Sequence, residues 1–229
     1  MIDIHTHILP FVDDGAKDFD ESKAIITSLV NQGVKHIFLT PHYYRERGYV
    51  SLCEHNLHIF NQLKEQVKDL DVTLYLGNEI KYSLDIFQYI EEGRVQPLSR
   101  QNFLIEFSVD TSEYDIFEAV HNMTAKGYLP VIAHIERYQA LKTLESIKQL
   151  RHLGAMVQVN VSALLGKYGG KTKKWILSLI KHHLVDFVAT DSHRFHENEW
   201  SKAYRFVCKK FSQEMADKIF NHTGILPKD

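Results

Sequence analysis

Apolar residues gather along this chain in seven short runs that are almost continuous rather than alternating. Val, Ile, Leu and Phe dominate these runs, which is typical of strands covered on both faces in a parallel sheet. The predicted strands are residues 2–7, 36–41, 73–79, 103–107, 130–134, 155–161 and 186–191.

Segments of helical period lie between these runs. In residues 20–32, Ala24, Ile25 and Leu29 fall on one helical face. The other predicted helices are residues 52–70, 84–92, 116–126, 141–153 and 173–184, with one or two closing helices in 200–220. Four helical segments are followed by a glycine that can end a helix in the left-handed conformation: Gly33, Gly93, Gly127 and Gly154.

Strands that alternate with helices predict right-handed crossovers and a parallel α/β sheet. With seven strands, such a sheet either closes as a slightly irregular barrel or stays open. The chain shows no internal repeat and no linker rich in Pro or Ser. We therefore expect one domain that spans residues 1–229.

Composition narrows the possible partners and the compartment. A formal net charge of -2 gives no basic field of the kind that holds nucleic acid. The apolar runs are far shorter than the ~20 residues that span a bilayer, and a candidate ligand, His5, lies close to the start, so we expect neither membrane insertion nor a removable leader. Cys53 and Cys208 are too few for a disulfide scaffold, which favours a cytoplasmic protein.

Imidazole and carboxylate side chains recur at the C-terminal ends of the predicted strands. His5 and His7 stand at i and i+2, so on a strand they point the same way with Cα atoms roughly 6.5 Å apart. An isolated His-x-His is as readily a chance pair as a metal-binding pair. Imidazole or carboxylate residues also stand at the ends of most other predicted strands. This recurrence favours a polynuclear metal centre, because an unpaired buried charge is costly. The candidate ligands are His5, His7, Asp14, His42, Glu79, Glu106, His134, Asp191 and His193.

Two acidic residues after the first strand are ambiguous. Asp13 is suited to cap a turn at Gly15, whereas Asp14 is either another cap, a metal ligand or a proton donor. Ligands of imidazole and carboxylate without thiolate suit Mn, Fe or Zn better than Mg alone.

These residues resemble the motifs of the polymerase-and-histidinol-phosphatase (PHP) superfamily. The opening at residues 3–10, the acidic turn at 13–15 and the phrase Thr40-Pro41-His42 resemble, within it, the bacterial manganese-dependent protein-tyrosine phosphatases of capsule and exopolysaccharide operons, the CpsB/CapC-like family. The resemblance extends to His193, and no ligand position departs from the pattern.

The resemblance implies a distorted seven-stranded parallel (β/α)7 barrel with three divalent ions, most suitably Mn. It implies a first ion on His5, His7, Glu79 and Asp191, a second on Glu79, Glu106 and His134, and a third on Asp14, His42 and His193, with the last two sets the least certain. Arg137 would clamp the phosphate. The family acts on phosphotyrosines in the tail of the cognate tyrosine kinase, which implies the same partner here.

A mechanism follows as a hypothesis. Three divalent ions outweigh the charge of the four carboxylate ligands, so the site should favour a phosphate dianion. A metal-bridging hydroxide would attack phosphorus in line with the departing phenolate. Because tyrosine has a pKa near 10, its phenolate needs little acid assistance. Asp14, or His42 or His193 through a metal-bound water, would supply that assistance, alongside Arg137 as a catalytic residue.

Substrate contacts and rival functions remain open from the sequence. Tyr43, Arg45 and Arg47 follow His42 and suit a phosphotyrosyl ring and an acidic peptide, although an ordinary polar loop explains them equally well. A cysteine-based phosphatase is disfavoured, because neither cysteine has an arginine six residues on. The rival functions are a histidinol-phosphate or nucleotide phosphatase, a metal-stabilised scaffold that binds the kinase tail, and a proofreading exonuclease. An oligomer is compatible with the sequence.

Overall fold

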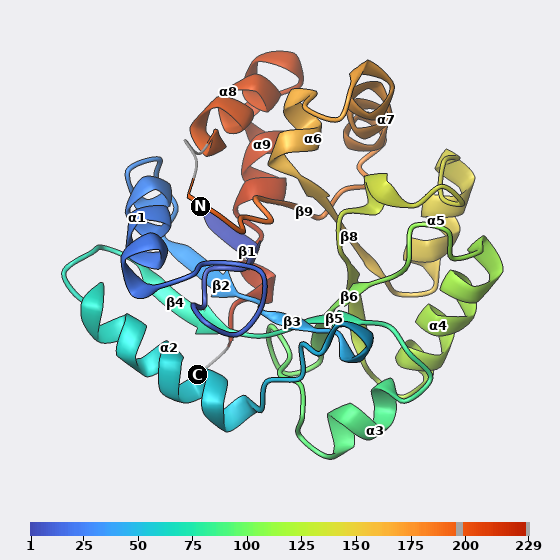
Figure 1. Ribbon diagram of the computed structural model, residues 1–229. Coiled ribbons are helices and arrows are strands. Elements are labelled where there is room, and N and C mark those ends of the chain that lie inside the picture. Colours follow the sequence, from blue (N-terminus) through green and yellow to red (C-terminus); the bar gives the residue numbers. More distant parts are fainter. Residues whose placement is uncertain (196–198, 228–229) are drawn as a thin grey trace.

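The computed structural model describes residues 1–195 and 199–227, and it shows a curled parallel sheet with helices around its outside (Figure 1). Within these residues the strands are β1 (Ile2–Thr6), β2 (His36–Leu39), β3 (His42–Tyr43), β4 (Thr73–Leu76), β5 (Glu79–Lys81), β6 (Asn102–Glu106), β7 (Leu129–Ile132), β8 (Met156–Asn160) and β9 (Phe187–Ala189). The helices are α1 (Phe19–Val30), α2 (Cys53–Gln66), α3 (Ile86–Glu91), α4 (Glu113–Ala125), α5 (Leu144–His152), α6 (Val161–Leu165), α7 (Gly170–Lys181), α8 (Trp200–Lys210) and α9 (Gln213–Phe220).

Every pairing between these strands is parallel, as the alternation of strands and helices predicted. One sheet has the order β1-β2-β4 and the other β3-β5-β6-β7-β8-β9. The first and last strands meet where His7 N donates to the carbonyl of Ser192 at 2.9 Å and Asp191 N donates to that of His5 at 2.9 Å. The first strand of the chain, β1, and the last, β9, therefore lie side by side.

Two of the seven predicted strands are interrupted, so the described strands form two sheets rather than one. The second predicted strand breaks at Thr40 and Pro41, where proline offers no N–H to a neighbouring strand. The third breaks at Gly77 and Asn78, and Asn78 N turns away to donate to the carbonyl of Gln96 at 3.0 Å. Each break lies directly before a candidate ligand, and the register places the two ligands His42 and Glu79 opposite each other.

The predicted helical segments coincide with helices, and the closing segment contains two, α8 and α9. Side-chain caps fix several starts; Asp18, for example, accepts from Glu21 N at 2.8 Å at the beginning of α1. Gly33, Gly93 and the other two glycines after helices have positive φ, as expected. Helix α6 was not predicted, because five residues directly after β8 are too few to show a helical period.

The hydrophobic core has two parts. The larger lies between the strands and the surrounding helices, and the smaller fills the inside of the curl with residues such as Ile4, Phe38, Leu104 and Val131. Ile225, near the end of the described chain, belongs to this inner cluster, so side chains occupy the interior below the strand ends. Across the described residues, none of the helices combines the length and apolarity needed to cross a membrane.

Candidate metal centre

Glu79 lies at the centre of the predicted ligands. Its carboxylate is almost fully buried and comes within 3.4 Å of His5 Nε2, 3.2 Å of His7 Nε2, 2.9 Å of His42 Nδ1 and 2.9 Å of His134 Nε2. These four histidines come from β1, the loop after it, β3 and the end of β7. The parallel sheet gathers them because the C-terminal ends of its strands open on one face.

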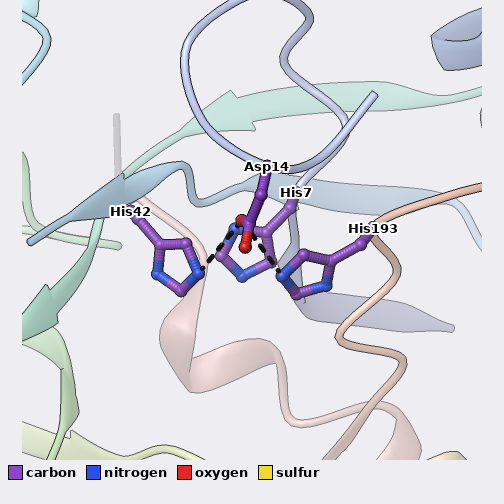
Figure 2. A group of neighbouring side chains, drawn as sticks. All are labelled: His7, Asp14, His42 and His193. Carbon is purple, nitrogen blue, oxygen red and sulfur yellow. Dashed lines mark ion pairs between the residues drawn. The ribbon is translucent and has the colours of Figure 1, made fainter. Parts of the chain in front are cut away.

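A second group forms around Asp14, which the loop after β1 places above the sheet (Figure 2). Asp14 Oδ1 lies 3.5 Å from His42 Nε2 and 3.6 Å from His193 Nε2. The rings of His7 and His193 stack with their centroids 4.0 Å apart. Ligand atoms of these four residues all lie within 4.8 Å of one another.

The remaining predicted ligands join the same cluster. Asp191 Oδ1 lies 3.5 Å from both His5 Nε2 and His7 Nε2. Glu106 Oε1 lies 3.7 Å from His134 Nε2. The structure thus brings all nine predicted ligands together. Three tight groups of ligand atoms share members: His7, Asp14, His42 and His193; His5, His7 and Glu79; and His42, Glu79 and Glu106.

The second of the implied ligand sets differs in membership from these groups. The resemblance assigned Glu79, Glu106 and His134 to one ion. The tight group around the two glutamates instead includes His42, while His134 approaches Glu79 at 2.9 Å and Glu106 at 3.7 Å. His42 therefore lies between two of the groups, within reach of both.

Two carboxylates of this cluster, Glu79 and Asp191, have lowered pKa values and are held ionised. Burial by itself would raise the pKa of Glu79, but the positive charges of His5 and His42 lower it well below its usual range. Burial also opposes ionisation of Asp191, whose pKa is nevertheless lowered by nearby positive charges, His5 first among them. Anionic carboxylates at neutral pH are what a cation site requires.

The unpaired polar atoms of the cluster fit metal ions. Asp14 Oδ1, which faces His42 and His193, is buried and makes no hydrogen bond. His5 Nε2 and His7 Nε2 face each other at 3.1 Å, within the roughly 3.0–3.4 Å that separates two nitrogens bound at about 2.1 Å to one ion at octahedral or tetrahedral angles. A donor set of imidazoles and carboxylates without thiolate suits Mn, Fe or Zn.

Asp13 supports the ligands from behind. Its Oδ1 accepts from Gly15 N at 2.9 Å, and its Oδ2 accepts from His42 N at 2.9 Å and from His7 Nδ1 at 2.8 Å. Burial would raise the pKa of Asp13, but the hydrogen bond and charge of His7 lower it. Asp13 therefore caps the turn at Gly15 and also fixes the orientation of the His7 ring, a role found behind metal-binding histidines.

Strand β8 supplies two further supporting residues that the sequence reasoning missed. Gln158 Oε1 contacts His5 Nδ1 at 3.3 Å and accepts from His134 N at 2.7 Å. Asn160 Nδ2 donates to Asp191 Oδ2 at 2.8 Å. Gln158 and Asn160 stand at i and i+2 in an apolar strand, as His5 and His7 do. The same spacing could therefore have identified them from the sequence.

Two of the predicted ligands have unusual backbone conformations. His134 has φ 32° and Asp191 has φ 53°, in the left-handed region that residues with a Cβ rarely adopt. Such strain persists only where the surrounding structure enforces it, and it concentrates at functional sites. Both residues follow the end of a strand, where the turn directs their side chains into the cluster.

The cluster opens into a cavity of about 440 Å³. Of the residues expected to bind phosphate or peptide, Arg137 and Arg47 line it. Arg137 also donates from Nη2 to Asp191 Oδ2 at 2.6 Å. Burial would lower the pKa of Arg137, but the charge of Asp191 raises it.

Two other expected substrate contacts do not line this cavity. Tyr43 is buried against Tyr89, and Arg45 lies at the surface, 3.9 Å from Asp85. Tyr44 lines the cavity instead. The period of two along a strand could have indicated this, because a residue two positions after an inward-pointing His42 shares its direction.

Other parts of the described chain lack this chemistry. A larger hollow of about 1220 Å³ lies between α1 and α8 and contains none of the nine ligands. Cys53 and Cys208 are free, lie on α2 and α8, and do not line the cavity. The chemistry of the side chains, not the size of the hollow, identifies the site.

The chain is similar to a known family and to named proteins within it. A family model described as capsular polysaccharide synthesis, CpsB/CapC, matches residues 1–225. The tyrosine-protein phosphatase CpsB of Streptococcus agalactiae serotype V is 33% identical over 234 residues, covering 96% of this chain and 95% of that protein.

Solved structures share the fold. One chain from the crystal structures of YwqE from Bacillus subtilis and CpsB from Streptococcus pneumoniae, described as unique metal-dependent tyrosine phosphatases, matches with a TM-score of 0.84 and 30% identity over 94% of this chain and 90% of that chain. Histidinol phosphate phosphatase from Lactococcus lactis matches with a TM-score of 0.63 and 17% identity over 91% of this chain and 92% of that one, a similarity of fold alone.

Proposed function

The chain belongs to the CpsB/CapC family of capsular polysaccharide synthesis proteins, and we propose that it is a metal-dependent protein-tyrosine phosphatase. The observation that carries the proposal is the convergence of five histidines and four carboxylates in one cluster beside the cavity, with Glu79 at its centre. A phosphotyrosine in the tail of a cognate bacterial tyrosine kinase is the proposed substrate, and capsular or exopolysaccharide synthesis the proposed process.

The nine clustered residues are the proposed holders of three divalent ions, with Mn the best fit. His5, His7, Glu79 and Asp191 would hold one ion. A second ion would be held by Glu79 and Glu106 together with His42 or His134. A third would be held by the group around Asp14. Ions of this kind supply Lewis acidity and water activation when bound.

Arg137 is the proposed phosphate clamp. One of its nitrogens is engaged by Asp191, and because a guanidinium has five N–H donors, others remain for phosphoryl oxygens in the cavity. The contact with Asp191 also fixes the direction of the guanidinium before substrate binds. Such a fixed donor stabilises the negative charge that develops on the equatorial oxygens.

The departing phenolate needs little help. Its conjugate acid has a pKa near 10, far below that of a serine alkoxide, so a weak proton donor suffices. Asp14, His42 and His193 form the group nearest the outer loop. Asp14 would donate that proton directly, whereas His42 and His193 would act through a bound water. Arg47, together with Tyr44, is the proposed contact for the peptide at the cavity wall.

We propose that the two sheets act together as one distorted seven-stranded barrel, which the bridge between Thr6 and Ser192 supports. Residues 1–229 would form a single PHP phosphatase domain. Two free cysteines are consistent with the proposed cytoplasmic location, and the net charge of -2 favours no nucleic-acid partner.

The test measures turnover and metal content together. Purified protein should hydrolyse a phosphotyrosyl peptide, lose that activity on chelation and regain it with Mn, and elemental analysis should count the bound ions. Replacing both Cys53 and Cys208 with serine should leave the activity largely intact. A strong preference for histidinol phosphate, inertness toward every aryl phosphate, or loss of activity in the double serine variant would each contradict the proposal.

A further inference from the structure

Lys81 enters the same cavity from strand β5. It stands two residues after Glu79, so the period of two along a strand gives both side chains the same direction, with Lys81 nearer the mouth. Its Cα pairs in register with that of Glu106 on the neighbouring strand. The lysine side chain is only 13% exposed and lines the cavity together with Arg137.

The ammonium group of Lys81 is poorly satisfied by the protein. Its Nζ lies 3.6 Å from Glu106 Oε2 and 5.1 Å from the centroid of the Tyr44 ring. Within residues 1–195 and 199–227 it makes no hydrogen bond, although an ammonium has three N–H donors. Because Nζ is not fully buried, its N–H donors are open to the cavity, where an anionic acceptor would bind them.

Tyr44 holds this lysine beside the cavity. The ring lies under Lys81 Nζ and also under the guanidinium of Arg47, each 5.1 Å from its centroid. The backbone of Tyr44 is fixed by reciprocal hydrogen bonds with Tyr49, at 2.8 and 3.1 Å. Tyr44, whose backbone these hydrogen bonds fix, therefore holds the lysine side chain beside the cavity.

We propose that Lys81 donates hydrogen bonds to the phosphoryl group of the substrate, as a second phosphate-binding cation beside Arg137. This rests on the proposed function and extends it. When Glu106 serves as a metal ligand, its charge no longer balances the lysine, and a phosphate dianion bound in the cavity would supply the missing negative charge. Lysine binds phosphate as a point charge, whereas arginine offers a planar pair of donors, so the two residues complement each other.

The experiment compares Lys81→Met, which keeps the length and apolar stem, with Lys81→Arg, which keeps the charge. Lys126→Met is the matched control: that ammonium also lies near a carboxylate, 3.5 Å from Glu91, and over a ring, 4.4 Å from the centroid of Phe87, but outside the cavity. The measurements are kcat and KM for a series of aryl phosphates, the Ki of inorganic phosphate, and metal content.

Lys81→Met should lower kcat/KM by about 10- to 100-fold and raise the Ki of phosphate by about tenfold or more, as expected for a lost charged hydrogen bond. Metal content should stay unchanged, Lys81→Arg should recover most of the loss, and Lys126→Met should match the unaltered protein. The loss should also be equal across aryl phosphates whose leaving groups differ in pKa.

Three results would overturn the proposal. An unchanged Ki would mean that Lys81 does not contact phosphate. A fall in metal content would mean that it only positions Glu106. A loss that grows with the pKa of the leaving group would identify a proton donor instead. If Lys81→Met does not fold, as judged by circular dichroism, the same comparison is made between Lys81→Gln and Lys81→Arg.

Failure of the proposed function would look different. Unaltered protein charged with Mn would then hydrolyse no aryl phosphate, whatever residue stands at position 81. Direct binding of inorganic phosphate, followed by calorimetry in the unaltered protein and in Lys81→Met, tests the lysine without turnover. Equal phosphate affinity in the two proteins would refute its role even in that case.

Discussion

Replacing Asp13 with asparagine should weaken metal binding while the fold persists. The buried carboxylate accepts from His7 Nδ1 at 2.8 Å, from His42 N at 2.9 Å and from Gly15 N at 2.9 Å. Asparagine keeps the shape but has only one accepting oxygen. If that oxygen remains with the two histidines, its NH2 group faces the N–H of Gly15, and two donors are left opposed.

The magnitude follows from these contacts. One buried donor without an acceptor costs about 1–3 kcal/mol of unfolding free energy. Losing the charge behind His7 also removes the partner that fixes its ring, and such changes typically reduce metal affinity by about 10- to 100-fold. That reduction corresponds to about 1.4–2.8 kcal/mol of binding free energy.

The assay measures Mn affinity by calorimetry or chelator competition, and stability by urea unfolding in the presence of chelator. Asp69→Asn is the matched control, because Asp69 is exposed and no ion pair or hydrogen bond engages its side chain in the described residues. Asp13 has no supporting role at the site if Asp13→Asn binds Mn as tightly as the unaltered protein and unfolds within about 0.5 kcal/mol of it.

Three further changes test other parts of the site and the fold. Gly15→Ala should disturb the loop, because a Cβ there would lie 1.9 Å from the carbonyl oxygen of His7, and elemental analysis should show fewer bound ions; full metal content would contradict this. Arg137→Ala should keep the metals but raise the Ki of phosphate by about tenfold or more, whereas a fall in metal content would assign it a structural role. Leu104→Ala should lower the free energy of unfolding in urea by about 2–5 kcal/mol, because Leu104 is fully buried inside the curl. Leu84→Ala, at an 89% exposed position, should change it by no more than about 0.5 kcal/mol. Equal effects of the two substitutions would contradict the assigned core.

Much of the site could be predicted because its residues break a strong local pattern. Histidines and carboxylates at the ends of apolar strands stand out, since an apolar strand has little reason to end in a buried charge. The parallel arrangement then follows from strands that alternate with helices, and it implies that those ends share one face. Gln158 and Asn160 break the same pattern but are neutral, so they signalled less strongly.

The direction of side chains next to the ligands depended on local geometry that the sequence shows only in part. Once His42 points into the cavity, alternation along the strand sends Tyr44 inward and Tyr43 toward Tyr89. By the same rule, Lys81 points into the cavity, as Glu79 does two residues before it. The breaks at Pro41 and Gly77, which divide two predicted strands, depend on where neighbouring backbone groups find their hydrogen bonds.

The sequence by itself determined which residues are candidate metal ligands and that they lie at the ends of parallel strands, because burial pattern and side-chain type are local properties. Only the tertiary structure decided how they are grouped. Arg137 meets Asp191 across 54 positions of the chain, and Asp13 reaches both His7 and the backbone of His42. Such contacts depend on how the strands curl and how the loops above them fold, and distances of a few ångströms between remote segments are set by packing of the whole chain.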